Sequence, residues 1–370
     1  MRVIAFGTYD VSSHPRVQAL IDGLRRHGAD VDECNVPLGM NARAAMLRRP
    51  WELLPLLLRL ASAWLRLAVR VRRMQPPDVV LVGYMGHADV HLARLLFGRT
   101  PIVLDHLISG STAARSRGIV RGPARRLLER LDTAALRVAD VVLTDTEEHR
   151  RMVPAPYRPK AVVVPVGAPQ AWFDAARLPE RPGAGRRPLK AIFFGLFAPV
   201  QGAPVIGAAL AQLRGYPIEV TLVGSGPDEA ATRRALGENG AGWVRWVPWV
   251  PGERLPALVA EHDVCLGVFS ASAYALRVVP HKVYQGAAAG CAVVTSDTMP
   301  QRRALGDAAV LVPPGDPDAL ADTLRRLAGH PAETLRLRET AHRLALKSFT
   351  PEHVVAPLME RLRALVSADT

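Results

Sequence analysis

Short apolar runs alternate with helical patterns of polar and apolar positions along the whole chain. Runs that are apolar along their full length are typical of strands buried on both faces, as in a parallel sheet covered by helices. The first half of the chain predicts strands at Arg2–Gly7, Asp78–Tyr84, Pro101–His106, Val141–Thr146 and Ala161–Gly167. The second half predicts strands at Ala191–Phe197, Glu219–Ser225, Trp243–Val250, Val264–Phe269, Cys291–Ser296 and Ala309–Val312. Helices are expected between them, and three closing helical stretches open at Pro317, Pro331 and Pro351.

A segment without a periodic apolar face separates these two arrays. Residues 169–189 are rich in Pro and Arg, and we interpret them as an interdomain linker. The sequence therefore predicts an α/β protein with two doubly wound Rossmann-like domains, residues 1–168 and 190–350, that face a central cleft.

One predicted helix, within 50–74, is unusually apolar. Its arginines, Arg59, Arg66, Arg70 and Arg73, are spaced by seven, four and three residues and so share one face. The length would allow a bilayer crossing, but the central arginines argue against it. Two interpretations stay open: a helix that lies on an anionic membrane or grips a lipid-linked acceptor, and a core helix with an Arg stripe at the surface or cleft.

Composition narrows the class of protein. With 49% hydrophobic and 22% charged residues, the 370-residue chain is globular and long enough for two full cores. Its three cysteines lie far apart, which excludes a disulfide scaffold and fits a reducing cytosol. No signal peptide opens the chain, so we expect a cytoplasmic protein, with the inner face of the membrane as a peripheral alternative. The net charge of +13 favours anionic partners, but no zinc-finger or helix-turn-helix pattern points to nucleic acid.

The loop after the first strand reads Gly-Thr-Tyr-Asp-Val-Ser-Ser-His-Pro-Arg over residues 7–16. A strand, a polar loop and a helix in this order point backbone N–H groups at an anion, to which Ser12, Ser13 and Arg16 would add donors. The loop lacks the GxGxxG spacing of a dinucleotide site. An ordinary loop with a Ser cap is the alternative.

Two further motifs lie in the second half. Leu222–Pro227 ends a strand and contains Gly224 and Gly226, two of the three glycines of the Rossmann motif. The missing third glycine disfavours an NAD site. Close approach of this backbone to a phosphate or a sugar stays plausible. Pro280 opens a helix with His281 and Lys282 in its first turn. Cations at a helix N-terminus oppose the helix dipole, which makes sense when an anion such as a diphosphate binds there. A routine surface helix start is the alternative.

Histidines and a carboxylate mark the first half. Asp105 and His106 end a predicted strand, where they would orient a sugar hydroxyl or transfer a proton. A capping Asp and a solvated His are the alternative. His87 and His91 would share a helix face like metal ligands, but no third ligand is evident, so we expect no metal site.

The second half resembles the nucleotide-sugar domain of the GT-B glycosyltransferases of family 4. The resemblance rests on a strand ending Val-Gly-x-Gly-Pro and a Pro-x-Lys helix that ends in small residues at Gly290. It extends from Gly-Thr-Tyr-Asp near the start to the helix after Thr350-Pro351-Glu352. It implies a retaining transfer of sugar from a nucleoside-diphosphate sugar, without a metal or other cofactor, and a closing helix, 351–370, that packs on an acceptor-binding first domain.

The resemblance also implies roles for individual residues. Catalytic roles fall to His106, Asp105 and Arg277. Donor-binding roles fall to Thr8, Tyr9, Asp10, Ser12, Ser13, Gly195, Gly224, Gly226, Val250, His281, Lys282 and Gln285. Acceptor-binding roles fall to His14, Arg16, Tyr84 and His87.

This chain departs from the family pattern at the site itself. The usual pair of Glu residues is replaced by Arg277 and Gln285, and the usual Arg and Lys after the first strand of the second domain are replaced by Leu196 and Gln201. Three alternatives to a glycosyltransferase therefore stay open: a nucleotide-sugar epimerase, a non-catalytic nucleotide-sugar-binding protein, and an NAD-linked oxidoreductase.

Overall fold

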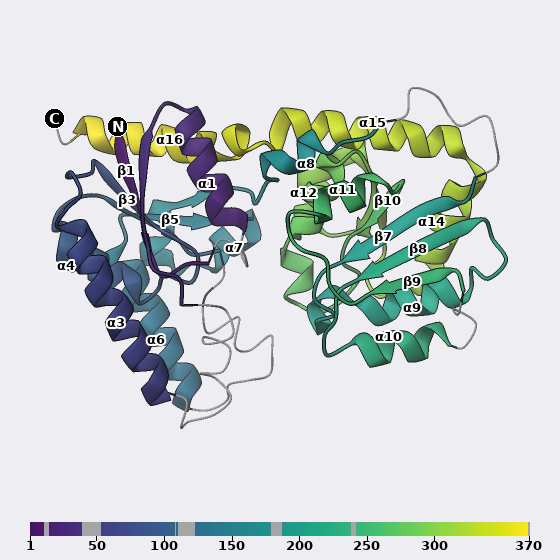
Figure 1. The fold of residues 1–370 in the computed structure, drawn as a ribbon, viewed down its shortest axis with the longest axis horizontal. Helices are drawn as coiled ribbons and strands as arrows, with labels where there is room; N and C mark the ends of the chain where they lie inside the picture. Colours follow the sequence, from purple (N-terminus) through teal and green to yellow (C-terminus); the bar gives the residue numbers. More distant parts are fainter. Residues whose placement is uncertain are drawn as a thin grey trace. The chain divides into compact units, whose positions relative to one another are not determined.

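The computed structural model describes residues 1–10, 15–38, 53–107, 109, 123–178, 187–237 and 242–368. Contacts divide the chain into two compact units. Unit 1 is Met1–Pro165 with Pro351–Thr370, and unit 2 is Val166–Thr350. Each unit is built on a six-stranded sheet in which every paired strand is parallel, with helices around it (Figure 1). The predicted α/β fold class with two doubly wound sheets is confirmed.

The sheet of unit 1 has the order β2-β1-β3-β4-β5-β6. Its strands are β1 (Arg2–Gly7), β2 (Asp30–Asn35), β3 (Val79–Val82), β4 (Ile102–Asp105), β5 (Val141–Thr144) and β6 (Ala161–Val163). Its helices are α1 (Pro15–Arg26), α3 (Leu53–Val71), α4 (Asp89–Phe97), α6 (Pro123–Val138), α7 (Glu147–Met152), η2 (Ala155–Lys160) and α16 (Pro351–Ala368). Alternate residues of the apolar strands enter two cores, one shared with α1 and α16 and the other with α3, α4 and α6.

The strand β2 is absent from the sequence prediction. It reads Asp-Val-Asp-Glu-Cys-Asn, and only Val31 and Cys34 are buried. Because β2 is an edge strand, one buried side chain on each face is enough: Val31 enters one core and Cys34 the other, so the continuous apolar run of the inner strands is missing.

The closing helix α16 packs against α1 within unit 1. Gly23 of α1 permits the close approach, because a Cβ there would lie 2.2 Å from the Pro351 carbonyl oxygen. In the described ranges, no helix is both long and apolar enough to span a membrane.

The sheet of unit 2 has the order β12-β11-β10-β7-β8-β9. Its strands are β7 (Leu189–Phe194), β8 (Ile218–Val223), β9 (Val244–Val247), β10 (Val264–Leu266), β11 (Ala292–Ser296) and β12 (Ala309–Val312). Its helices are α8 (Gln170–Asp174), η3 (Pro199–Gln201), α9 (Ala203–Ala211), α10 (Glu229–Leu236), α11 (Leu255–Ala260), η5 (Ala275–Arg277), α12 (His281–Ala288), α13 (Met299–Leu305), η6 (Gly306–Ala308), α14 (Pro317–Gly329) and α15 (Pro331–Ser348).

The segment expected to be a linker, 169–189, belongs to unit 2 and contains α8. Trp172 of α8 is buried, and its ring stacks on Phe194 at the end of β7 with 5.6 Å between ring centroids. Two aromatic side chains in a Pro-rich stretch give no helical periodicity, which is why the sequence pattern did not reveal this helix. Residues 179–186 lie outside the described part of the chain.

Candidate functional site

The order of strands in unit 2 creates a switch point between β7 and β10. From β7 the chain proceeds outward through β8 and β9, and from β10 it proceeds the other way through β11 and β12. In open parallel sheets, ligands bind outside the carboxyl ends of the strands at such a point. The loops after β7 and β10 meet there, since the Phe269 N–H donates to the Gln201 carbonyl oxygen at 3.0 Å.

Lys282 reaches this switch point from the first turn of α12. Pro280 stands at the N-cap, so the helix begins at His281. The Lys282 ammonium donates to Gln201 Oε1 at 2.9 Å and lies 3.6 Å from the centroid of the Phe193 ring. Both contacts are with uncharged groups, and the residue is only 5% exposed.

Among the described residues of unit 2, no charged side chain compensates the charge of Lys282. Burial lowers its pKa to about 7, with a small opposing effect from Cys265. No carboxylate among the described residues forms an ion pair with it. A buried cation without a counterion is unstable unless an anion arrives, so this position is suited to an anionic ligand.

The glycines expected to bind the donor bring two loops together. Gly195 and Gly224 follow β7 and β8, and a Cβ on Gly224 would lie 2.0 Å from the Gly195 carbonyl oxygen. Both have positive φ, at +135° and +117°. A Cβ on Gly226 would lie 2.8 Å from the Phe197 N. The two loops are thus packed backbone against backbone beside Lys282, which lies 3.4 Å from the Cβ position of Gly195.

Other expected residues lie along the same part of unit 2. Gln285 is buried one turn beyond Lys282 on α12, and His281 is half-buried at the helix start. Arg277 is half-buried in η5, and Val250 is half-buried after β9. Sequence reasoning missed Trp249, which is 74% exposed in the same loop as Val250. The sequence analysis placed Trp249 inside the expected strand Trp243–Val250, whereas β9 ends at Val247 and leaves Trp249 in the loop.

In unit 1 the first loop is partly occupied by internal hydrogen bonds. The Thr8 N–H and hydroxyl both donate to Asp89 Oδ2, at 2.8 and 2.7 Å, and the Trp64 indole donates to Asp89 Oδ1 at 2.9 Å. Tyr9 is buried against Gly83, and burial raises the pKa of its hydroxyl. Tyr84 and Asp10 are half-buried. Ser12, Ser13 and His14 lie outside the described residues.

Arg16 and Asp105 form a buried ion pair. Arg16 Nε donates to Asp105 Oδ1 and Oδ2 at 2.9 and 3.2 Å, and both side chains are 1% exposed or less. Burial raises the pKa of Asp105, and the Arg16 guanidinium opposes that rise. Arg16 Nη1 donates to the Pro165 carbonyl oxygen, while Nη2 is buried with no hydrogen-bond partner in the described part of unit 1.

His106 lies beside this pair and contacts a second histidine. Its Nδ1 is 2.9 Å from His87 Nε2, and the same His87 nitrogen is 3.7 Å from Asp132 Oδ1. Burial, followed by the charges of His87 and His149, lowers the pKa of His106 well below its usual value. His87 and His91 do not share a helix face, because α4 begins only at Asp89 and His87 contacts His106. No three potential metal-ligating side chains cluster within the described ranges.

Sequence reasoning also missed a histidine–aspartate pair after β5. His149 Nδ1 lies 2.5 Å from Asp145 Oδ1, and both side chains are buried. Their charges act on His106 and Asp105 respectively, so the pair belongs to the same polar cluster. The sequence signal that could have revealed this pair is the spacing of four residues between Asp145 and His149 at the start of α7, whose N-cap is Thr146.

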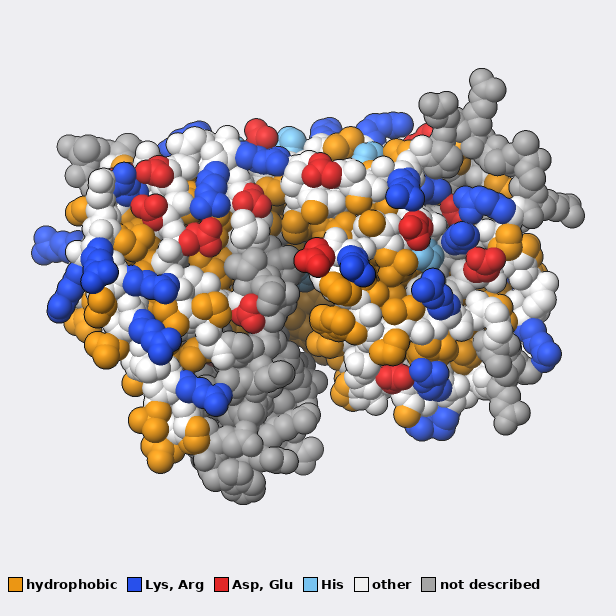
Figure 2. All heavy atoms as spheres, viewed as in Figure 1, with side chains coloured by type: hydrophobic (Ala, Val, Ile, Leu, Met, Phe, Trp, Pro, Cys, Tyr) orange, Lys and Arg blue, Asp and Glu red, His pale blue; other side chains and the backbone are white. Residues whose placement is uncertain are grey.

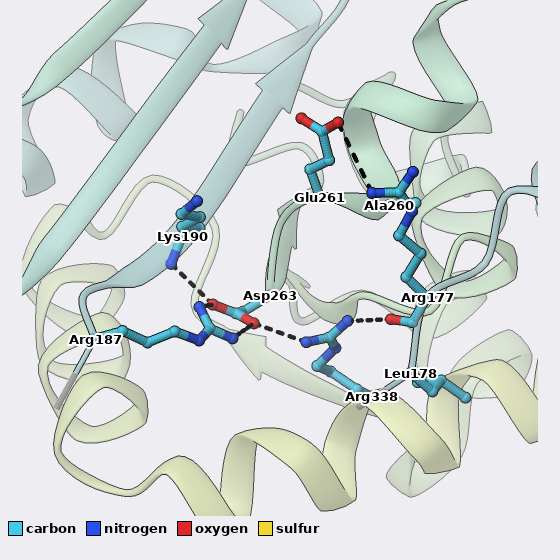
Figure 3. A pocket seen from close by; sticks show the side chains of 8 residues that line it. All are labelled: Arg177, Leu178, Arg187, Lys190, Ala260, Glu261, Asp263 and Arg338. Carbon is cyan, nitrogen blue, oxygen red and sulfur yellow. Dashed lines mark hydrogen bonds and ion pairs between the residues drawn. The ribbon is translucent and has the colours of Figure 1, made fainter. Parts of the chain in front are cut away.

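A second polar cluster of unit 2 lies at the opposite, amino-terminal edge of its sheet. Figure 3 shows Arg187 and Arg338 reaching Asp263, which immediately precedes β10. Arg187 donates to both carboxylate oxygens at 2.7 and 2.6 Å, Arg338 donates at 2.7 Å, and the Lys190 N–H donates at 3.0 Å. Because the carboxylate is fully used by these donors, the cluster ties β7, β10 and α15 together.

A known protein family matches the part of unit 2 that contains Lys282. We call the carboxyl ends of its strands around this residue the Lys282 edge. Residues 188–330 match the sequence model described as Glycosyl transferases group 1. This stretch runs from the start of β7 through α14 and contains Lys282 and the glycine loops. Unit 2 carries a group 1 glycosyl transferase domain. The expected enzyme class, a glycosyltransferase, is confirmed by this domain.

Solved structures resemble the chain over almost its whole length. A sucrose-phosphate synthase from Thermosynechococcus elongatus is 17% identical, with a TM-score of 0.70 and 99% of each chain covered. HepE of Anabaena, in complex with UDP, is 13% identical, with a TM-score of 0.66 and coverage of 98% of this chain and 99% of its own. An α,α-trehalose 6-phosphate synthase from Burkholderia multivorans is 14% identical, with a TM-score of 0.63 and coverage of 100% and 99%.

These likenesses show the fold, which is the expected GT-B fold. No curated protein sequence matches the chain. The glycosyl transferase domain is thus assigned by its own sequence match, and the residues around Lys282 are interpreted from their geometry.

Proposed function

We propose that this protein transfers a sugar from a nucleoside-diphosphate sugar to an acceptor, with the donor bound at the Lys282 edge of unit 2. The bond between the sugar and the diphosphate breaks, the acceptor oxygen forms the glycosidic bond and gives up its hydroxyl proton, and the nucleoside diphosphate and the proton leave. Following the family 4 resemblance, the configuration at the reacting carbon is retained and no metal takes part.

The observation that carries this proposal is the buried, uncompensated ammonium of Lys282. A diphosphate oxygen at this position would receive the Lys282 charge at the positive end of the α12 helix dipole. Negative charge grows on the diphosphate as its bond to the sugar breaks, so preorganised donors here lower the barrier.

Neighbouring residues complete the donor site in this proposal. Gln285 hydrogen-bonds a ribose hydroxyl from the second turn of α12, without the charge assistance that a Glu would give. Trp249 stacks on the base, because an exposed indole offers a flat apolar face. HepE of Anabaena forms complexes with UDP and with UDP-glucose, which makes a UDP-sugar the first donor to test.

Unit 1 supplies the acceptor side. Arg16, Asp105 and His106 are held rigidly by buried contacts, which suits groups that orient a hydroxyl. Tyr84 and His87 lie on the segment that follows β3, next to this cluster. In this proposal the compound that receives the sugar carries a hydroxyl group, which these side chains hold by hydrogen bonds.

Donor binding is tested by calorimetric titration with UDP, GDP, dTDP and ADP, with NAD as a negative control. We expect one nucleotide to bind. At 100 times its Kd, that nucleotide should raise the free energy of unfolding by about 2.7 kcal/mol. Lys282→Met, which removes the charge and keeps the volume, should abolish that binding. Lys347→Met on α15, an exposed lysine, is the matched control. Equal binding by Lys282→Met would contradict the donor site.

Catalysis is tested separately with the donor that binds. NMR of the product gives the configuration at the reacting carbon, and turnover in EDTA tests metal independence. Inversion or loss of activity in EDTA would overturn those two points. Donor conversion without an acceptor would indicate an epimerase, and tight binding without turnover would indicate a non-catalytic binding protein.

A further inference from the structure

Helix α3 of unit 1 exposes apolar side chains along most of its length. Leu54, Leu57, Leu58 and Leu65 recur at helical spacing, and Leu54, Leu58 and Leu65 are 66%, 63% and 68% exposed. The side of α3 that packs on the core instead carries Ala63 and Leu67, both buried. The exposed leucines therefore form a separate face that unit 1 does not use.

Two neighbouring helices of unit 1 also expose leucines. Leu127 and Leu131 of α6, four residues apart, are 58% and 49% exposed, and Leu95 of α4 is 79% exposed. Both α3 and α6 pack on α4. Half of the large hydrophobic side chains exposed in the described part of the chain lie on these three helices. We call α3 with these residues of α4 and α6 the leucine surface.

Arginines border the leucine surface. Arg59 and Arg66 lie seven residues apart on one side of α3 and are exposed, and the 19-residue helix contains no Asp or Glu. Figure 2 shows hydrophobic and basic side chains together in the lower left of the view, where α3 lies in Figure 1. A leucine face beside an arginine face is the pattern of a helix that lies in the plane of a membrane interface.

We propose that the leucine surface docks on an anionic lipid bilayer, with the leucines in the boundary between headgroups and acyl chains and the arginines on lipid phosphates. Charge decides between this partner and a second copy of the chain. Two copies that meet through this surface would bring the arginines of α3 together, which costs energy. The exposed side chains are aliphatic and lack the Trp and Tyr anchors common at protein–protein interfaces.

The experiment is co-sedimentation of the full chain with vesicles, without donor or acceptor, so that its outcome is independent of the proposed transfer reaction. We expect binding to phosphatidylglycerol–phosphatidylcholine vesicles and much weaker binding to phosphatidylcholine alone. Salt should weaken the binding, because exposed charges are screened.

Two pairs of variants separate the contributions. Leu54→Glu with Leu58→Glu should lower vesicle affinity more than tenfold, whereas Leu346→Glu on α15, also an exposed leucine, should not. The double variant Arg59→Gln with Arg66→Gln should also lower vesicle affinity, by about fivefold for each arginine that is replaced. Arg336→Gln with Arg343→Gln, the same spacing on α15 of unit 2, should leave it unchanged.

The proposal fails if the wild-type chain does not sediment with anionic vesicles, or if the α3 variants bind as the wild type does. It also fails if the chain without lipid forms a dimer in analytical ultracentrifugation that Leu54→Glu with Leu58→Glu abolishes, because the surface would then be an interface between copies. Circular dichroism and urea unfolding check that each variant is folded.

Discussion

His87 Nε2 and His106 Nδ1 lie 2.9 Å apart and share one hydrogen bond. The Asp132 carboxylate lies 3.7 Å from the same His87 nitrogen and favours a proton there, so we infer that His87 is the donor. His106 then accepts at Nδ1 and carries its own proton on Nε2. Since burial also keeps its pKa well below the usual value, His106 is a neutral hydrogen-bond donor at pH 7.

This state of His106 predicts a loss of stability in mild acid. Its pKa is about 6.5 in the unfolded chain and lower in the fold, so the unfolded state binds more protons below pH 6.5. The free energy of unfolding should therefore fall as the pH drops below about 6.5, by up to about 1.4 kcal/mol per pH unit from this group. His106→Gln should flatten the fall, measured by urea unfolding at pH 7.5, 6.5 and 5.5.

His91→Gln is the control for this measurement. His91 lies on α4 of the same unit but is exposed, so its replacement should leave the slope as it is in the wild type. An equal slope for wild type and His106→Gln would mean that another group causes the acid sensitivity.

The lowered pKa of Lys282 predicts that donor binding depends on pH in the alkaline range, above pH 7. Its pKa of about 7 in the free protein must rise when a diphosphate binds, so binding takes up a proton above pH 7. Affinity for the nucleoside diphosphate should fall up to about tenfold per pH unit above 7. Lys282→Arg, which keeps its charge at all these pH values, should give a flat profile.

Calorimetric titration between pH 7.5 and 9 checks this prediction, because nucleotide phosphates, with a second pKa of about 6, are fully ionised there. Titration in two buffers of different ionisation enthalpy gives the proton uptake directly. A wild-type affinity that does not change over this range would show that the Lys282 proton is not linked to binding.

The apolar strands were predictable because a strand buried on both faces must be apolar at every position. All six strands of unit 2 lie within or next to predicted apolar runs, whereas the polar edge strand β2 was missed. The helix α8 was missed for a related reason, since Trp172 and Phe173 pack without any periodic pattern around them.

The sequence was enough to predict an anion-binding lysine at the site, but not the side chains that surround it. Lys282 was singled out because a lysine in the first turn of a helix opposes the helix dipole, a conflict that local sequence shows. Its burial against Phe193 and Gln201 depends on the neighbouring strand β7, far away in sequence. The contact between His87 and His106 joins the segments that follow β3 and β4, two paired strands, so local sequence does not show it.

Gln285 offers a gain-of-function prediction. It occupies the place where the family resemblance implies a Glu that holds the ribose hydroxyls, and a carboxylate accepts such hydrogen bonds more strongly than an amide does. Gln285→Glu should tighten nucleotide binding by about 1 kcal/mol, roughly fivefold, and Gln285→Leu should weaken it. Calorimetry with the nucleotide and with its 2′,3′-dideoxy analogue checks the role, because the analogue should bind all three proteins alike.

Asp263 predicts a large effect on stability with no direct effect on the donor site. Asp263→Asn keeps the shape but leaves the buried guanidinium of Arg338 without its counterion, which should cost about 3–5 kcal/mol at pH 7. Asp322→Asn, at an exposed pair with Arg325, is the matched control and should change little. Urea unfolding measures both.

The pH profile of the Asp263 effect gives a second check. Burial alone would raise the pKa of Asp263, but Arg187, the Lys190 N–H and Arg338 outweigh it, so the pKa is lowered in the fold. The stabilisation is therefore fully present above about pH 4, the unfolded value, and is lost as the pH falls through the lowered pKa. The gap between wild type and Asp263→Asn should stay constant from pH 7 to 5 and narrow below pH 4. A gap that narrows already at pH 6 would point to a histidine instead of this carboxylate.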